Sequence, residues 1–240
     1  MIILITGGSS GLGEAITRTL AADAGNSVYF TYNSSFEKAK QIETDLPNAT
    51  AIKCDFKNET EIDLLKTRLT ELNIDVLINN AYGGEAIKTY FHKIPATDFL
   101  TDFKENIVPT IVLTQAAINV FRKKKFGKII NVLTSFIINT PPTGSSVYVA
   151  NKAYLEELSK VWASENAKYN ITSNSVSPAF MQTGFTAGVD ERLIEQMIEN
   201  HPLKQLLPVA DVADAIAFMV SSSQHVNGIN LIINSGVNIK

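Results

Sequence analysis

Short apolar runs alternate with longer amphipathic stretches along the whole chain. Seven of the short runs are apolar on both faces, which is typical of strands in a parallel sheet covered by helices on either side. These predicted strands are Ile2–Thr6, Ser27–Tyr32, Thr50–Cys54, Val76–Asn79, Lys128–Leu133, Thr172–Ser177 and Asn230–Ile233.

The stretches between these runs have the periodicity of amphipathic helices. They are Gly11–Asp23, Phe36–Asp45, Glu59–Leu72, Thr97–Lys124, Val147–Lys168, Glu191–Asn200 and Val209–Ser221. This alternation predicts an α/β fold, a Rossmann-like doubly wound sheet of about seven parallel strands flanked by helices. Its 240 residues suit one domain, 1–240. The least regular segment, near 179–207, is expected to be an insertion that carries a substrate loop.

Charge and composition exclude several classes of function. The net charge of -3 argues against a nucleic-acid partner. No apolar stretch is long enough for a membrane span, and Cys54, the single cysteine, leaves no internal disulfide. The three histidines, His92, His201 and His225, lack metal-ligand spacing. We therefore expect a cytoplasmic protein with no metal site, no membrane partner and no nucleic-acid partner.

The first predicted strand runs directly into a glycine-rich turn, T-G-G-S-S-G-L-G. Gly7 permits the tight turn out of the strand, Gly11 lets backbone approach a pyrophosphate, and Gly13 lets the following helix pack close to the sheet. The start of that helix presents free N–H groups to phosphate. The strand–turn–helix order predicts dinucleotide binding.

The end of the second predicted strand indicates which dinucleotide is bound. An acidic residue there would accept a hydrogen bond from the ribose 2′-hydroxyl of NAD. The sequence instead has hydroxyl and amide side chains, among them Asn33 and Ser34, with Lys38 one turn further on. These donors suit a 2′-phosphate, so NADP(H) is predicted over NAD(H).

Two further strand ends carry candidate cofactor contacts. Asp55, followed by Phe56, either accepts from the adenine amino group or caps the turn that follows the third strand. The fourth strand ends in Asn79-Asn80-Ala81, where amide and small side chains can approach the cofactor.

A candidate acid–base pair lies in the middle of the chain. Tyr148 and Lys152 share one face of a predicted helix because they are four residues apart. A free phenol has a pKa of about 10, and a nearby ammonium lowers it toward the working pH. Ser135, just after the fifth strand, can orient a substrate oxygen at the carboxyl edge of the sheet. Asn106 lies within the long preceding helical pattern and is either a functional amide or a polar residue that bends the helix.

Together these motifs resemble the short-chain dehydrogenase/reductase family in its compact branch. The order T-G-x-x-x-G-x-G, N-N-A, a serine, Y-x-x-x-K and a proline after the next strand spans nearly the whole chain. The resemblance implies that Tyr148 exchanges a proton with the substrate, Lys152 lowers the tyrosine pKa and binds the nicotinamide ribose, and Ser135 polarises the carbonyl. Asn106 would hold a water that links Lys152 to solvent.

The same resemblance implies a set of cofactor contacts. Besides Tyr148 and Lys152, they are Gly7, Ser9, Ser10, Gly11, Leu12, Gly13, Asn33, Ser34, Asp55, Phe56, Asn80, Ala81, Pro178 and Thr183. Because family members are commonly symmetric oligomers, a homotetramer or homodimer is expected.

Three positions depart from the family pattern. Tyr82 stands where a glycine usually follows N-N-A, and its ring either enters the substrate mouth or lies in a subunit contact. Ala179 replaces the usual glycine after Pro178, and Pro109 lies close behind Asn106, where the helix is expected to kink.

The expected activity is hydride transfer between a nicotinamide and a ketone or secondary alcohol. The run from Tyr32 to Ala39 and the overall layout are similar to 3-oxoacyl-[acyl-carrier-protein] reductases. The partner would then be a small carbonyl or alcohol substrate or a carrier-bound thioester, although no basic cluster marks a carrier-protein site. Two alternatives stay open: an NAD-dependent sugar, polyol or hydroxysteroid-type alcohol dehydrogenase, and a non-catalytic dinucleotide sensor.

Overall fold

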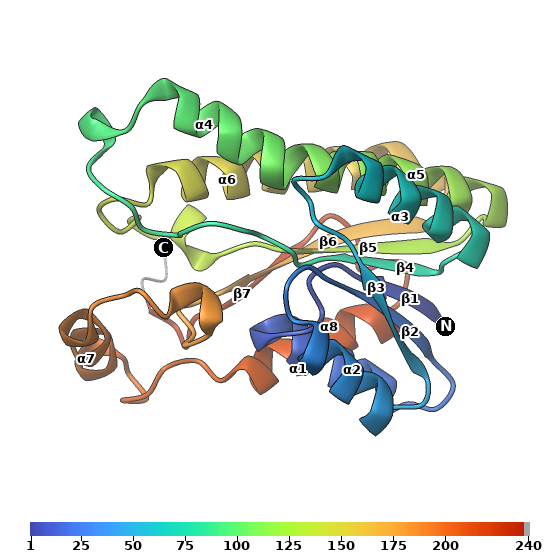
Figure 1. Ribbon diagram of the computed structural model, residues 1–240, viewed down its shortest axis with the longest axis horizontal. Coiled ribbons are helices and arrows are strands. Elements are labelled where there is room, and N and C mark those ends of the chain that lie inside the picture. The colour runs from blue at the N-terminus through green and yellow to red at the C-terminus, as the bar shows by residue number, and fades with distance from the viewer. Residues whose placement is uncertain (238–240) are drawn as a thin grey trace.

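A single parallel sheet forms the centre of the molecule (Figure 1). The structure is a computed structural model and describes residues 1–237. The 7-stranded sheet has the order β3-β2-β1-β4-β5-β6-β7, and every pairing is parallel. The strands are β1 (Ile2–Ile5), β2 (Ser27–Tyr32), β3 (Ala49–Lys53), β4 (Val76–Asn79), β5 (Gly127–Val132), β6 (Ile171–Pro178) and β7 (Asn230–Ile233).

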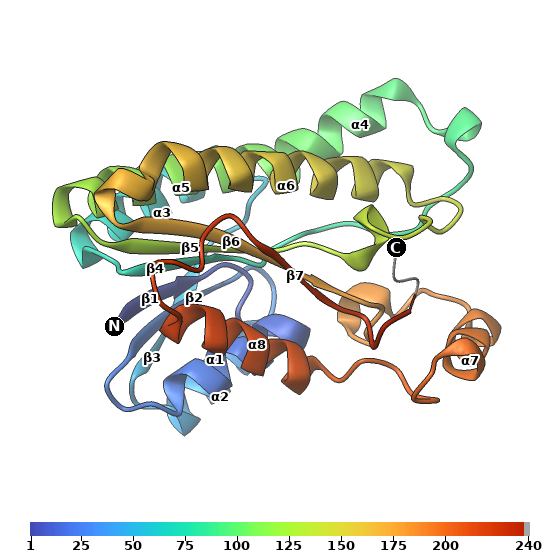
Figure 2. The same ribbon diagram turned by 180° about the vertical axis from the view of Figure 1, so that it is seen from behind.

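Helices cover both faces of the sheet, as the sequence predicts (Figures 1 and 2). One face carries α1 (Gly11–Ala21), α2 (Phe36–Asp45) and α8 (Val209–Ser221), and the other carries α3 (Glu59–Leu72), α5 (Val108–Lys124) and α6 (Ser146–Asn166). Each face buries its own apolar cluster, one around Ile16 and Phe30 and the other around Leu69 and Phe121. The strand order reverses between β1 and β4, where doubly wound folds bind ligands.

The long helix expected over Thr97–Lys124 is interrupted, which corrects that prediction. Helix α4 (Ala96–Asp102) leads into a π-helical turn at Phe103–Ile107, and α5 begins at Val108. Within the turn, the Val108 N–H donates to the Phe103 carbonyl, five residues back. Proline has no N–H to donate, and Pro109 stands at the start of α5, where that loss is tolerated.

The segment between β6 and α8 stands away from the sheet. It contains a 3-10 turn at Gly184–Thr186 and the helix α7 (Glu191–Asn200), none of whose side chains is fully buried. Figure 1 shows α7 projecting beyond the helical layers. Within residues 1–237, no helix combines the length and apolar character needed to cross a membrane.

The single cysteine of the chain, Cys54, lies in the core. Cys54 is buried with its thiol reduced, and burial raises the pKa of that thiol to about 12. It is therefore a packed thiol and not a thiolate nucleophile at neutral pH.

Candidate functional site

A cavity of about 970 Å³ opens along the carboxyl ends of the strands. Its lining comes from the glycine turn after β1, the ends of β2 to β6 and the segment that follows β6. Every predicted site residue lines it except Ser135. The topology thus brings together side chains from distant parts of the sequence at one edge of the sheet.

The glycine turn, residues 7–13, requires its glycines for two separate reasons. Gly7 has φ +66 and Gly11 has φ +53, a backbone region that side chains disfavour. At Gly13, a Cβ would lie 1.9 Å from the Gly7 carbonyl oxygen, so any side chain would force the turn and α1 apart. The Ser10 hydroxyl makes no capping hydrogen bond at the start of α1. The free N–H groups of that helix end can therefore meet a phosphate in the cavity.

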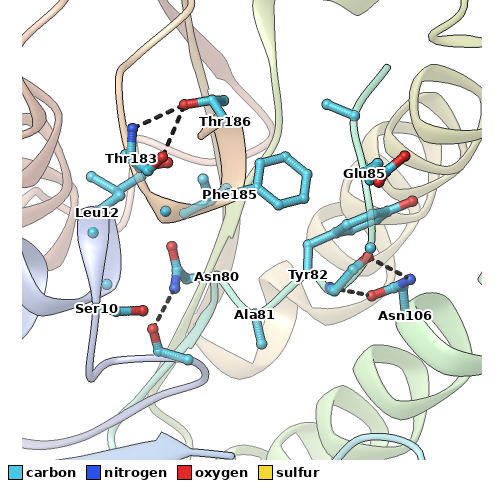
Figure 3. A pocket seen from close by; sticks show the side chains of 18 of the residues that line it. Ser10, Leu12, Asn80, Ala81, Tyr82, Glu85, Asn106, Thr183, Phe185 and Thr186 are labelled. Carbon is cyan, nitrogen blue, oxygen red and sulfur yellow. Dashed lines mark hydrogen bonds between the residues drawn. The ribbon is translucent and has the colours of Figure 1, made fainter. Parts of the chain in front are cut away.

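Asn80 fastens the glycine turn to the end of β4. Its side-chain amide donates to the Thr6 carbonyl at 2.9 Å and to the Gly7 carbonyl at 3.0 Å (Figure 3). The Thr6 hydroxyl oxygen in turn accepts from the Asn80 and Ala81 N–H groups, both at 3.0 Å. The N-N-A motif therefore shapes the pocket by holding two strand ends together.

The tips of β2 and β3 form the far end of the cavity. Asn33 and Ser34 line it, with no acidic neighbour at the tip of β2. Asp55 and Phe56 also line it, but the Asp55 carboxylate accepts from the Lys57 N–H at 2.9 Å. Asp55 thus caps its own turn, which was one of the two roles expected from the sequence.

Tyr148 and Lys152 come together on one face of α6, as their spacing predicts. The Lys152 Nζ lies 5.7 Å from the centroid of the Tyr148 ring and donates to the Val132 carbonyl at 2.7 Å. Burial lowers the pKa of Lys152 to about 7, while the negative charge of Asp102 opposes that shift. Burial raises the pKa of Tyr148 to about 12. Desolvation thus raises the phenol pKa, in place of the lowering that the sequence led us to expect from the ammonium.

The hydroxyl that faces Tyr148 belongs to Thr134. Thr134 lines the cavity, and its side chain beside the phenol of Tyr148 lowers the pKa of that phenol against the effect of burial. Ser135, buried to 3% exposure, begins a 3-10 turn and is absent from the cavity lining. Strand β5 ends at Val132, one residue before the predicted Leu133, and Thr134 continues in extended conformation toward the cavity.

Asn106 reaches the cavity from the π-helical turn. Its side-chain oxygen accepts from the Gly83 N–H at 2.7 Å, and its amide donates to the Gly83 carbonyl at 3.3 Å (Figure 3). The same amide lies 3.2 Å from the Asp102 carbonyl oxygen. Asn106 therefore fixes the loop that follows β4, and it lies within the helix irregularity that the sequence left open as its alternative role.

The segment after β6 closes the cavity over the glycine turn. Pro178 and Thr183 both line the cavity, and a Cβ on Gly11 would lie 3.2 Å from the Thr183 Cβ. Phe185 points toward Tyr82 (Figure 3) and lies 5.7 Å from Tyr148 between ring centroids. These contacts give a dinucleotide a covered site between the turn and this segment.

Several residues of the site were missed from the sequence. The sequence predicted Ser135 as the hydroxyl at this strand end and not the adjacent Thr134. Asp102 and Asn151 are hydrogen-bonded to each other, and Asp102 also to Tyr82 of the cavity lining, while Phe185 packs against Tyr148. The signal for Asp102 was an acidic residue four positions before Asn106, on the same helical face. Among residues 1–237, no group of three or more metal-ligating side chains is arranged to hold a metal ion.

Known proteins share this arrangement over almost the entire length. A family model described as enoyl-(acyl carrier protein) reductase matches residues 7–238. A 3-oxoacyl-[acyl-carrier-protein] reductase FabG of Rickettsia prowazekii (strain Madrid E) is 32% identical, covering 98% of this chain and 95% of the relative. A 2,3-dihydro-2,3-dihydroxybenzoate dehydrogenase of Bacillus subtilis (strain 168) is 29% identical, covering 99% of this chain and 96% of the relative.

A solved structure of a short chain dehydrogenase/reductase family protein superposes with a TM-score of 0.87 at 28% identity, covering 98% of this chain and 96% of that one. The comparisons of sequence and of structure therefore point to the same family as the glycine turn and the tyrosine–lysine pair. The chain belongs to the short-chain dehydrogenase/reductase family of oxidoreductases, which use a nicotinamide cofactor.

Proposed function

We propose that this protein is an NADPH-dependent reductase of a ketone, with a 3-oxoacyl thioester as the leading substrate class. The observation that carries the proposal is that the Tyr148 phenol lines the same cavity as the glycine turn. The likeness to a 3-oxoacyl-[acyl-carrier-protein] reductase over 98% of the chain supports the substrate class.

The residues around the phenol suit proton donation to a carbonyl oxygen. The bound nicotinamide supplies the hydride for the carbonyl carbon. Because its pKa is raised to about 12, Tyr148 holds its proton at neutral pH and can transfer it to the oxygen that becomes an alcohol. The Thr134 hydroxyl, which lies beside that phenol, is placed to orient the same oxygen. Lys152 supports the phenol from the next turn of α6 and binds the ribose hydroxyls.

The polar groups at the tip of β2 support NADPH as the cofactor. Asn33 and Ser34 offer donors at the far end of the cavity, where a carboxylate would repel a 2′-phosphate. Lys57 also lines the cavity, and its ammonium lies 3.0 Å from a Glu105 carboxylate oxygen. That cation is thus partly neutralised, and the preference for NADPH rests on the lack of an acid at the tip of β2.

An assembly of identical subunits in the cytoplasm completes the proposal. Three apolar side chains on the outer surface of α5 and α6 remain substantially exposed: Val108 at 39%, Tyr154 at 44% and Val161 at 45%. Such surfaces suit association with a second copy, either as a homodimer or as a homotetramer. Light scattering of the purified protein distinguishes the two from a monomer.

The first experiment follows NADPH absorbance, with NADH in parallel, against acetoacetyl thioesters, simple ketones and keto-sugars. Consumption of NADPH with the thioester supports the proposed substrate class. Turnover of other carbonyls alone keeps the reductase and overturns that class. A preference for NAD with alcohols would favour the alternative of an NAD-dependent alcohol dehydrogenase. NADPH binding without turnover of any compound would favour the sensor alternative.

A further inference from the structure

A buried carboxylate and a second tyrosine stand next to the Tyr148–Lys152 pair. Tyr82 follows β4 and lines the cavity, and its phenol donates to Asp102 Oδ1 at 2.5 Å. The same carboxylate oxygen accepts from the Asn151 amide at 2.8 Å and lies 3.3 Å from the Asn106 amide. Asp102 is only 6% exposed. Its burial is tolerated because these donors satisfy it.

The ring of Tyr82 touches both members of the proposed catalytic pair. The Lys152 Nζ lies 4.7 Å from the centroid of that ring, closer than it lies to the Tyr148 ring. The Tyr82 and Tyr148 rings pack edge to face, with an angle of 88° between their planes and centroids 5.0 Å apart. Phe185 packs against both rings, with its centroid 6.0 Å from that of Tyr82 (Figure 3) and 5.7 Å from that of Tyr148. Tyr82 therefore enters the site, which was one of the two placements left open by the sequence.

The charges around Lys152 are few. Asp102 supplies the nearby negative charge, and it is partly shared with Lys88, whose ammonium lies 4.0 Å from the other carboxylate oxygen. Tyr82 and Tyr148 are the adjacent titratable groups, and burial raises the pKa of both, so both are neutral at pH 7. A buried ammonium is costly unless an anion or an aromatic face lies close by, and this site provides both.

We propose that Tyr82 and Asp102 are positioning residues that stabilise the ammonium form of Lys152 beside Tyr148. They hold the pKa of Lys152 higher than burial alone would allow. The hydrogen bond to Asp102 fixes the Tyr82 ring, whose negative face meets the lysine, and the carboxylate adds its charge at the hydroxyl end of the ring. The electrostatic part of this proposal stands on the geometry alone. Its catalytic consequence rests on the proposed function, because a charged Lys152 is what assists Tyr148 there.

The decisive measurement is the titration of Lys152 by carbon-13 NMR in protein labelled at the lysine Cε, without substrate or cofactor. The Lys152→Arg variant identifies the signal. Asp102→Asn removes the negative charge and keeps the volume of the side chain, so we expect the titration midpoint of Lys152 to fall by about one pH unit. Asp98→Asn, in the first turn of the same helix α4, is the matched control and leaves the midpoint unchanged.

Two variants of Tyr82 separate its ring from its hydroxyl. Tyr82→Leu removes the aromatic face and is expected to lower the midpoint, whereas Tyr82→Phe keeps the face and lowers it less. Tyr82→Leu also keeps the carboxylate, so it tests the proposal if Asp102→Asn does not fold. A Lys152 midpoint that is unchanged in folded Asp102→Asn and in folded Tyr82→Leu overturns the proposal.

Turnover then separates positioning from packing. With the proposed reductase activity established, Asp102→Asn should lower kcat more than it raises KM and move the alkaline fall of the rate to lower pH. A uniform loss of rate at every pH would indicate packing alone and would contradict the proposal. Failure of the wild-type protein to reduce any carbonyl would overturn the proposed function, while the NMR titration would still decide the role of Tyr82 and Asp102.

Discussion

The glycine turn and the wall around Tyr148 line one cavity but are stabilised by different kinds of contact. The turn is shaped by backbone: Gly7 and Gly11 adopt positive φ, Gly13 packs on the Gly7 carbonyl, and Asn80 ties the turn to β4 through main-chain oxygens. The wall around Tyr148 is shaped by side chains that contact one another. Backbone geometry suits any dinucleotide, whereas the side-chain contacts determine the chemistry and the substrate.

Removing the phenol should produce the largest effect of any change to this wall. We expect Tyr148→Phe to lose about 10²- to 10⁴-fold in kcat, because the proton donor disappears. NADPH affinity should stay close to that of the wild type, since the glycine turn is untouched. Single-turnover kinetics measure the loss of rate, and a fluorescence titration measures the NADPH affinity. A variant with near-normal rate would exclude Tyr148 as the acid.

Thr134 and Ser135 offer a sharper test of the same wall. Thr134→Val removes the hydroxyl that faces Tyr148 and keeps the shape, so kcat should fall about 10²-fold. Ser135→Ala is the matched control and should cost much less, because Ser135 lies outside the cavity lining. Thr134→Ser should restore most of the rate. The opposite ranking of the two variants would return the role to Ser135.

A side chain added within the glycine turn should disrupt its backbone conformation. Gly13→Ala places a methyl group 1.9 Å from the Gly7 carbonyl oxygen. We expect a loss of about 1–3 kcal/mol in the free energy of unfolding, together with weaker NADPH binding. Denaturant unfolding measures the first and fluorescence the second. Gly184→Ala, where a Cβ would meet no atom within 4 Å, is the control for the unfolding measurement and should leave the free energy of unfolding unchanged.

Cofactor preference is the test at the far end of the cavity. Asn33→Asp introduces a carboxylate where the 2′-phosphate is proposed to bind, and we expect the ratio of NADPH to NADH efficiency to fall about tenfold, about 1.4 kcal/mol. The measurement is kcat/KM for both cofactors with one substrate. An unchanged ratio would place the 2′-phosphate elsewhere.

The smallest effect concerns pH and stability. The pKa of Lys152 is lowered from 10.5 to about 7 by burial, so between these values the unfolded chain binds more protons than the folded one. Lys152 therefore makes the protein more stable as pH rises through this window. Thermal unfolding should show a steeper rise from pH 7 to 9 in the wild type than in Lys152→Met. Equal slopes would show that Lys152 is solvated.

The sequence was sufficient for the fold because most of its strands are apolar on both faces and its helices are amphipathic, although β6 buries a run of small polar side chains. The bounds of β2, β4 and β7 match the predicted runs, and so do those of α2 and α3. The glycine turn and the Tyr148–Lys152 pair were also predictable, because turn geometry and helical spacing are local.

The contacts around that pair could not be predicted in the same way. Whether Thr134 or Ser135 faces Tyr148 depends on where β5 ends, and a shift of one residue changes the side chain that is presented. The bond between Tyr82 and Asp102 joins residues 20 positions apart, one in the loop after β4 and one at the end of α4. The pKa of Tyr148 depends on burial, which no spacing reveals.

The π-helical turn at Phe103–Ile107 acts as a one-residue insertion confined to a single turn. It lets α5 keep Leu113, Ala117 and Phe121 in phase with the sheet while α4 is rotated so that Asp102 meets Tyr82. The face that α4 presents to Tyr82 is thereby independent of the face that α5 presents to the sheet. Deleting one residue within the turn would leave the packing of α5 intact and swing Asp102 by about 100° away from the cavity, because each helical residue turns by that angle.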